Sequence, residues 1–209
     1  MNQTILRINP WSRIKLRTWQ KSLAVLKNGN SRFIQNKVNN ILHHDLELLS
    51  EAQNPYAVIL CCSDSRVSPD IIFDRGLGDL FVIQNAGNVC DTSVFGSIQY
   101  AIQFLKTPLI IVLGHTGCGA VTAAHNHKRM KGPLQSIVSL IDKHIVDGSV
   151  LDSTENHTLE TAKTLSSALN LHQDKFEQEL KVIPAIYNIS SGYISWMDID
   201  KEALSIPDH

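Results

Sequence analysis

Three short apolar runs, alternating with segments of helical spacing, constrain the fold of this 209-residue chain more than any other feature. The runs are YAVILCC at 56–62, DLFVIQN at 79–85 and PLIIVLGH at 108–115. They are apolar along most of their length instead of alternating with polar residues, which is typical of strands covered on both faces. Strands of this kind alternate with helices in α/β proteins. We therefore predict an α/β fold with a mainly parallel β-sheet flanked by helices.

Apolar positions at helical spacing predict helices around these strands, and GYISWMDID at 192–200 predicts a final strand. The triplet Asn28-Gly29-Asn30 is expected to end the first helix, and Ser68 is expected to cap a short helix at SPDII. The expected helices cover residues 13–28, 31–52, 69–72, 91–105, 117–130, 133–145, 155–169 and 174–188.

Charge is unevenly distributed along the chain. Residues 1–44 contain eight Lys or Arg and no Asp or Glu, so all 20 acidic residues follow. We divide the chain into a basic N-terminal helical arm at 1–30 and a single α/β domain at 31–209. Packing of the arm on the acidic body or on a neighbouring subunit is the favoured interpretation. Nucleic-acid binding is not expected, because the body is acidic and no reader motif is present.

The apolar runs are too short to span a bilayer, and the first residues lack the apolar core of a secretory signal. We expect a cytoplasmic protein with no membrane partner, with organellar targeting by the basic arm as the alternative. Four cysteines in such a chain predict reduced thiols that bind metal or react, not a disulfide framework. Cys61 is expected to be a small core residue and Cys90 to pack in a loop.

Two cysteines and one histidine stand where the predicted strands end. Cys62 ends the first strand, His115 ends the third, and Cys118 follows on the turn into a helix. Because ligands in open α/β sheets gather beyond the carboxyl ends of the strands, these side chains can converge on one point. Two thiolates and one imidazole suit Zn²⁺. Three protein ligands leave a fourth position open, as in a catalytic zinc site.

Asp64 and Arg66 follow Cys62 at spacings that place all three on one side of an extended segment. Arg66 can then hold the Asp64 carboxylate by a bidentate pair. Asp64 is expected either to occupy the fourth metal position or to lie beside it. The glycines around HTGC, Gly119 among them, let the backbone approach a metal ion and substrate closely.

Several segments, in the same order, resemble the β-class carbonic anhydrase family, closely over residues 22–127 and loosely in the last third of the chain. They are LKNGNSRF, AQNPYAVIL, CSDSRVSPDIIFDRGLGDLFVIQNAGN, GSIQYAIQFL and LIIVLGHTGCGAV. The resemblance implies a zinc ion held by Cys62, His115 and Cys118, with Asp64 and Arg66 as the catalytic dyad beside it. It also implies reversible hydration of carbon dioxide to bicarbonate and a proton through zinc-bound hydroxide.

The resemblance further implies a homodimer or homotetramer, in which the N-terminal helices wrap the partner subunit. Gln53, Phe81 and Tyr100 match residues that line the substrate pocket from the neighbouring subunit. In some members of the family the aspartate ligates zinc in a closed, inactive state, so Asp64 is a candidate fourth ligand.

Two residues depart from the family pattern. Gln84 stands where the family usually has arginine, and Ile59 stands where members with a regulatory bicarbonate pocket have tryptophan. We therefore expect weak or absent bicarbonate inhibition through such a pocket. Two other functions compete with hydration of carbon dioxide: hydrolysis of carbon disulfide or carbonyl sulfide at the same site, and a catalytically silent zinc-binding role. The intact pair of Asp64 and Arg66 argues against the silent role.

Overall fold

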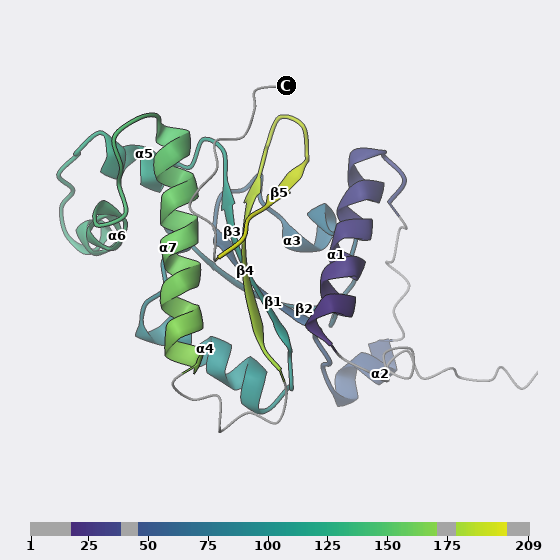
Figure 1. Ribbon diagram of the computed structural model, residues 1–209. Coiled ribbons are helices and arrows are strands. Elements are labelled where there is room, and N and C mark those ends of the chain that lie inside the picture. Colours follow the sequence, from purple (N-terminus) through teal and green to yellow (C-terminus); the bar gives the residue numbers. More distant parts are fainter. Residues whose placement is uncertain (1–17, 39–45, 171–178, 200–209) are drawn as a thin grey trace, which may run out of the picture.

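The computed structural model describes residues 18–38, 46–170 and 179–199, and within them a five-stranded sheet carries helices on both faces (Figure 1). The strands lie in the order β2-β1-β3-β4-β5. Their bounds are β1 Ala57–Cys62, β2 Leu80–Asn85, β3 Leu109–His115, β4 Lys181–Tyr187 and β5 Ile194–Trp196. The first four are parallel, and β5 is antiparallel to β4. The predicted α/β class and mainly parallel sheet are confirmed.

The helices occupy many of the positions that apolar spacing predicted. They are α1 Trp19–Ile34, α2 Leu46–Glu51, α3 Pro69–Ile72, α4 Thr92–Gln103, α5 Gly119–His125, α6 Pro133–Asp142 and α7 Val150–Asn170, with a 3₁₀ turn η2 at Ala86–Asn88. The triplet Asn28-Gly29-Asn30 does not end the first helix, because α1 continues through it to Ile34. The helix expected over 31–52 is wrong at 35–38, where the chain turns, and residues 39–45 lie outside the described residues.

Among the described helices, none combines the length and the apolar character needed to cross a membrane.

The helix expected over 174–188 is wrong wherever the structure describes it. Residues 181–187 form strand β4 between β3 and β5 instead. All but the first of these residues are buried, and such a run of apolar, partly β-branched residues suits a strand covered on both faces. The carbonyl of Pro184 accepts the N–H of Met197, just past β5, so this residue directs its backbone groups toward the end of the β4–β5 pairing. Proline is tolerated there because the N–H that it lacks would lie at that end and not between β3 and β4.

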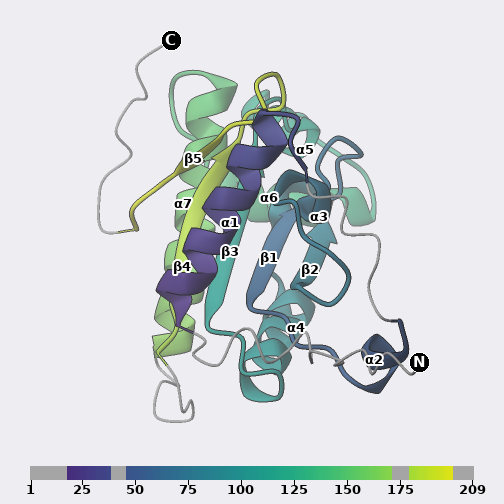
Figure 2. The ribbon, with the colours of Figure 1, turned by 90° about the vertical axis from the view of Figure 1, so that its right-hand side faces the viewer.

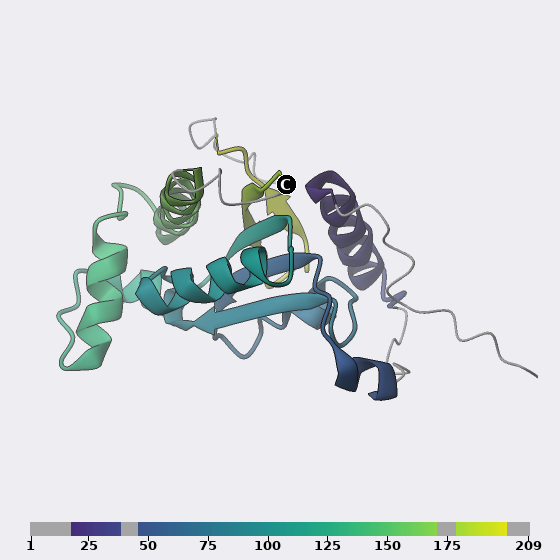
Figure 3. The same cartoon turned by 90° about the horizontal axis from the view of Figure 1, so that it is seen from below.

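Alternate residues of the central strands build two apolar layers, one on each face of the sheet. Ile59 and Ile111 belong to the layer that packs against α1 and α3. Leu60 and Val112 belong to the layer that packs against α4 and α7. Figure 2 looks onto α1 with α7 behind the sheet, and Figure 3 shows these two helices on opposite sides of β4 and β5. Burial on both faces explains why β1 and β3 are apolar at almost every position.

Strand β2 differs from the other long strands because it lies at an edge of the sheet. It pairs only with β1 among the described strands, and its residues are half-buried or, at Gln84, exposed. The expectation of a second fully buried strand is therefore wrong for the single chain. An edge strand leaves backbone groups available for a further partner.

Polar contacts hold α1 on the body of the domain. The side-chain amide of Asn30 donates to the carbonyls of Ile72 at 3.3 Å and Gly192 at 2.9 Å. Arg32 pairs with the buried carboxylate of Asp74, so a basic residue of the N-terminal segment packs on an acidic residue of the body.

Helix α1 continues across residue 30, where the sequence suggested a division between arm and domain. Because residues 1–17 lie outside the described residues, the arm at 1–30 and the domain at 31–209 stay predictions.

The close approach of α1 to α3 generates a stability test. A Cβ at Gly29 would lie 1.7 Å from the carbonyl oxygen of Phe73. We expect Gly29→Ala to lower the free energy of unfolding by about 1–3 kcal/mol, because two backbones must separate. The matched control is Gly96→Ala on α4, where a Cβ meets nothing within 4 Å and should raise the free energy of unfolding by up to about 1 kcal/mol. Urea denaturation measures both, and equal effects of the two substitutions would contradict this packing.

Candidate metal centre

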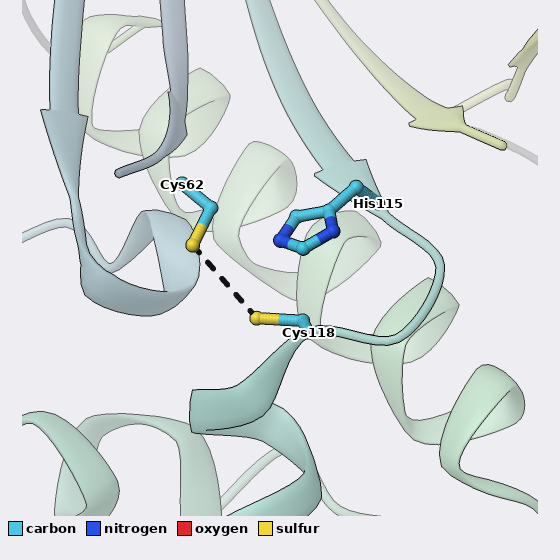
Figure 4. A group of neighbouring side chains, drawn as sticks. All are labelled: Cys62, His115 and Cys118. Atoms are coloured by element: carbon cyan, nitrogen blue, oxygen red, sulfur yellow. Dashed lines mark hydrogen bonds between the residues drawn. The ribbon is translucent and has the colours of Figure 1, made fainter. Parts of the chain in front are cut away.

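The three side chains expected to bind metal meet at the carboxyl end of the sheet (Figure 4). Cys62 is the last residue of β1, His115 is the last residue of β3, and Cys118 precedes α5. The Sγ atoms of Cys62 and Cys118 lie 4.0 Å apart. One ligand atom from each of the three residues lies within 4.8 Å of the others. Parallel pairing of β1 with β3 brings these residues together, because it places their carboxyl ends side by side.

His115 is oriented so that one ring nitrogen faces the two sulfurs. Its side chain is fully buried, and Nδ1 lies 3.0 Å from the carbonyl oxygen of Thr116, so Nδ1 carries the hydrogen and donates. Nε2 is the ring nitrogen left to bind a metal ion, and it has no hydrogen-bond partner among the described residues. Burying a polar atom without a partner costs about 1–3 kcal/mol. A metal ion between this nitrogen and the two sulfurs would supply the missing bond, as ligating histidines commonly show.

The two sulfur atoms form a hydrogen bond with each other. The thiol of Cys118 donates to Cys62 and lowers the pKa of Cys62 to about 4, with help from the Gly87 N–H at 3.4 Å. The same contact raises the pKa of Cys118 far above its usual value, although backbone N–H groups at the start of α5 oppose this. Metal binding would displace the proton of this hydrogen bond and yield two thiolates. Two sulfurs and one imidazole nitrogen are a donor set that fits Zn²⁺.

Asp64 lies beside this cluster and is held by Arg66. Oδ1 of Asp64 accepts hydrogen bonds from the Arg66 backbone N–H at 3.0 Å and from Nε at 2.8 Å, and Oδ2 accepts from Nη2 at 2.7 Å. The guanidinium holds the pKa of Asp64 well below its usual range, so this carboxylate is ionised at neutral pH. Oδ2 also lies 4.0 Å from Nε2 of His115. The bidentate pair that the spacing suggested is therefore present at the edge of the cluster.

Comparison with known proteins places this arrangement in a family. The sequence model of the family described as "Carbonic anhydrase" matches residues 57–194, which include the cluster and its Asp–Arg pair. The chain belongs to the β-class carbonic anhydrase family. The carbonic anhydrase of Mycolicibacterium smegmatis is 50% identical over 103 residues, which are 47% of this chain and 48% of that protein. The chain thus spans about half the length of this relative and of carbonic anhydrase 2 of Mycobacterium tuberculosis.

Solved β-carbonic anhydrases have the same fold over most of their length. The β-carbonic anhydrase CcaA is 27% identical, with a TM-score of 0.64 over 85% of this chain and 88% of that chain. CafA of Aspergillus fumigatus is 26% identical, with a TM-score of 0.66 over 88% of this chain and 92% of that chain. The likeness in fold therefore covers more of the chain than the 103 residues matched at 50% identity.

In this β-class family member, Gln84 closes the loop that carries the Asp–Arg pair. Its amide Nε2 donates to the carbonyl of Cys62 at 3.2 Å and to that of Val67 at 3.1 Å. These carbonyls lie at the two ends of the segment that contains Asp64 and Arg66. From the sequence, Gln84 was noticed only as a departure from the family pattern, and this contact was not predicted. It could have been found only from the pairing of β1 with β2, which sets Gln84 beside the end of β1.

The expected pocket residues do not all lie near the cluster. Gly119 opens α5 next to Cys118 and is exposed. Phe81 pairs across the strands with Val58, which lies four residues before Cys62, or about 13 Å along the sheet. Its ring lies 6.3 Å from that of Tyr100, which is 46% exposed. Gln53 is exposed and precedes β1, at the opposite end of the strand from Cys62. Within one chain, Gly119 therefore lies beside the metal cluster, and the other three residues lie away from it.

The remaining two cysteines have surroundings that differ from those of the cluster. Cys61 is fully buried on the face of the sheet that packs against α1, and burial raises its pKa to about 12. Cys90 is half-buried in the segment between η2 and α4, and burial raises its pKa to about 11. Both side chains are thiols at neutral pH, and their burial agrees with the expectation that Cys61 packs in the core and Cys90 in a loop.

The donor set generates a binding test. We expect the chain to bind one Zn²⁺, and we expect Cys118→Ser to weaken this binding at least about 100-fold, because a thiolate ligand is lost. Cys90→Ser is the matched control and should bind Zn²⁺ as the unaltered chain does. Competition with a chromophoric chelator measures the dissociation constants. Equal Zn²⁺ affinities for the two variants would show that Cys118 is not a ligand.

Proposed function

We propose that this chain is a zinc-dependent enzyme that hydrates carbon dioxide reversibly to bicarbonate and a proton. The observation that carries the proposal is a cluster of three donor atoms from the described residues, with the ionised carboxylate of Asp64 beside it. A closed structural zinc site usually has four protein ligands, whereas a catalytic site keeps one position open. Membership of the β-class carbonic anhydrase family supports the same activity.

Cys62, His115 and Cys118 would hold the ion, and bound Zn²⁺ supplies a Lewis acid that makes a water molecule reactive near neutral pH. The Oδ2 atom of Asp64 is near enough to the cluster to accept a hydrogen bond from that water and so direct its lone pair toward the carbon of carbon dioxide. Arg66 holds both carboxylate oxygens, which supports an arrangement in which Asp64 orients the reacting water and does not ligate the metal.

The charge state of Asp64 has a consequence for pH dependence. Its pKa lies below the usual range because Arg66 donates to it, so the carboxylate accepts hydrogen bonds and cannot donate over the range pH 6–9. Any rise of activity with pH in this range must therefore come from another group.

Apolar neighbours of the two sulfurs, such as Val89 and Val121, limit access of bulk water and suit a small uncharged substrate.

We also propose that the active form is a homodimer or homotetramer in which a partner subunit supplies Gln53, Phe81 and Tyr100 to the substrate pocket. The support is the half-buried edge strand β2 together with an exposed aromatic pair beside it. The ring of Phe104, which is 70% exposed, lies 5.2 Å from that of Tyr100. Burying such rings against a second copy of the chain would remove apolar surface from water. Wrapping of the partner by the N-terminal arm stays part of this proposal.

Stopped-flow hydration of carbon dioxide by protein of known zinc content tests the activity. We expect the rate to scale with zinc content, and we expect Asp64→Asn to lower kcat/KM about 100-fold or more, because a neutral amide orients the water poorly. Asp142→Asn, at an exposed site on α6, is the matched control and should keep full activity.

The outcomes of this experiment separate the competing functions. Full activity of Asp64→Asn would contradict the role of that carboxylate. A zinc-loaded protein that hydrolyses carbonyl sulfide or carbon disulfide but does not hydrate carbon dioxide would establish the sulfur-substrate hydrolase instead. A zinc-loaded protein that turns over none of these substrates would establish a silent zinc-binding role.

The assembly has its own test. Light scattering on a size-exclusion column should give at least twice the mass of one chain. We expect Phe104→Glu to shift the protein toward the monomer, because a charge would be buried at the proposed interface. Leu134→Glu on α6, at another exposed apolar residue, is the matched control and should leave the mass unchanged. A monomer in the unaltered protein, or equal effects of the two substitutions, would contradict this surface as the interface.

A further inference from the structure

A pair of histidines outside the ligand set is connected to the metal cluster through one glycine. His157, on α7, is 1% exposed, and its Nε2 lies 2.8 Å from the carbonyl oxygen of Gly87. Its Nδ1 lies 2.9 Å from Nδ1 of His144. Both nitrogens of this buried ring therefore have a partner, which holds the ring in one orientation.

The two contacts determine where the ring hydrogens lie. The carbonyl of Gly87 can only accept, so Nε2 of His157 carries a hydrogen and donates it. Burial lowers the pKa of His157 to about 4, so its ring is neutral near pH 7 and Nδ1 has a lone pair. His144, whose pKa is also lowered by burial, must then donate from its own Nδ1. His144 thus selects the tautomer of His157 that donates to Gly87.

Gly87 lies in the 3₁₀ turn η2 and directs its N–H at the cluster. Its φ of 73° is in the left-handed region, and a Cβ there would lie 2.7 Å from Cδ1 of Ile141. Its N–H donates to Sγ of Cys62 at 3.4 Å. A glycine has the greatest backbone freedom of any residue, so its orientation depends on the groups that bind its N–H and carbonyl. His157 binds the carbonyl oxygen of Gly87 and so restricts the orientation of the glycine whose N–H donates to Cys62.

We propose that His157 is a positioning residue of the metal centre, which holds Gly87 so that its N–H stays on the Cys62 sulfur. The inference rests on the proposed function only in that the cluster binds Zn²⁺. A hydrogen bond to a ligating sulfur reduces the charge that the sulfur donates to a metal ion and fixes its direction. Outer contacts of this kind typically change metal affinity by about 10–100-fold. His144 acts one step further out, by setting the tautomer of His157.

Metal binding measured without substrate tests this inference. Metal-free full-length protein is titrated with Co²⁺ while the thiolate-to-metal absorption band is recorded, and Zn²⁺ affinity is measured by chelator competition. We expect His157→Leu to weaken Zn²⁺ binding about tenfold. We also expect its Co²⁺ band to move to longer wavelength, because a sulfur without its N–H donor gives up electrons more easily. His157→Gln retains an N–H that can reach Gly87 and should restore both values toward those of the unaltered protein.

His125 supplies the matched control. Its Nδ1 lies 2.9 Å from Oγ of Ser153 on α7, but no hydrogen bond found among the described residues joins it to Gly87. His125→Leu should therefore leave the Co²⁺ band and the Zn²⁺ affinity unchanged. The inference is overturned if a folded His157→Leu variant keeps the original band and affinity, or if His125→Leu shows the same losses.

A second variant covers the case in which His157→Leu does not fold. His144→Leu removes the donor to Nδ1 of His157, so the tautomer of His157 that donates to Gly87 loses its support and the Gly87 contact is weakened. It should move the Co²⁺ band part of the way, and an unchanged band in this variant would also overturn the inference. Failure of the unaltered protein to hydrate carbon dioxide would overturn the proposed activity alone, because the band and the affinity are read without substrate. Failure to bind Zn²⁺ would overturn both.

Discussion

The parallel pairing of β1 with β3, buried on both faces, is the constraint on which the rest of the structure depends. Its register runs from Val58 opposite Ile110 to Cys61 opposite Leu113, and it brings the ends of the two strands to one edge. Cys62 and His115 then face one point, and the short turn after His115 delivers Cys118. Apolar helices on both sides hold this pairing, so the core that stabilises the domain is also what positions the donor atoms.

Around the donor atoms, each loop is held by a hydrogen bond to the backbone. Gln84 bridges the ends of the loop that carries Asp64, and Arg66 binds both oxygens of that carboxylate. On the other side of the cluster, His157 binds Gly87, whose N–H reaches Cys62. Such contacts restrict loops that would otherwise move, and a preorganised site loses less entropy when it binds a metal ion or substrate. The buried Nε2 of His115, which has no hydrogen-bond partner among the described residues, gives this site a further unmet bonding capacity that a metal ion would satisfy.

One chain contains the donor atoms and the Asp–Arg pair of the proposed active site, but not a complete substrate pocket. The donor atoms and the Asp–Arg pair lie within a single chain. Phe81 and Tyr100 instead lie beside the half-buried edge strand, together with the exposed ring of Phe104. In the proposed dimer, a second copy of the chain would cover this sheet edge and aromatic surface and would complete the substrate pocket.

The sequence by itself determined β1, β3 and the Asp64–Arg66 pair, because continuous apolar runs and short spacings are local signals. It also indicated the Cys–His–Cys set, because Cys62 and His115 end two predicted strands and Cys118 follows within three residues. It misassigned residues 181–187 as helix, because burial between two strands outweighed the apparent helical spacing. Only the tertiary structure showed the contacts of Gln84 and of His157. In both, a side chain binds the backbone carbonyl of a residue distant in sequence, and a carbonyl is the same in every residue, so the pattern of side chains carries no trace of it.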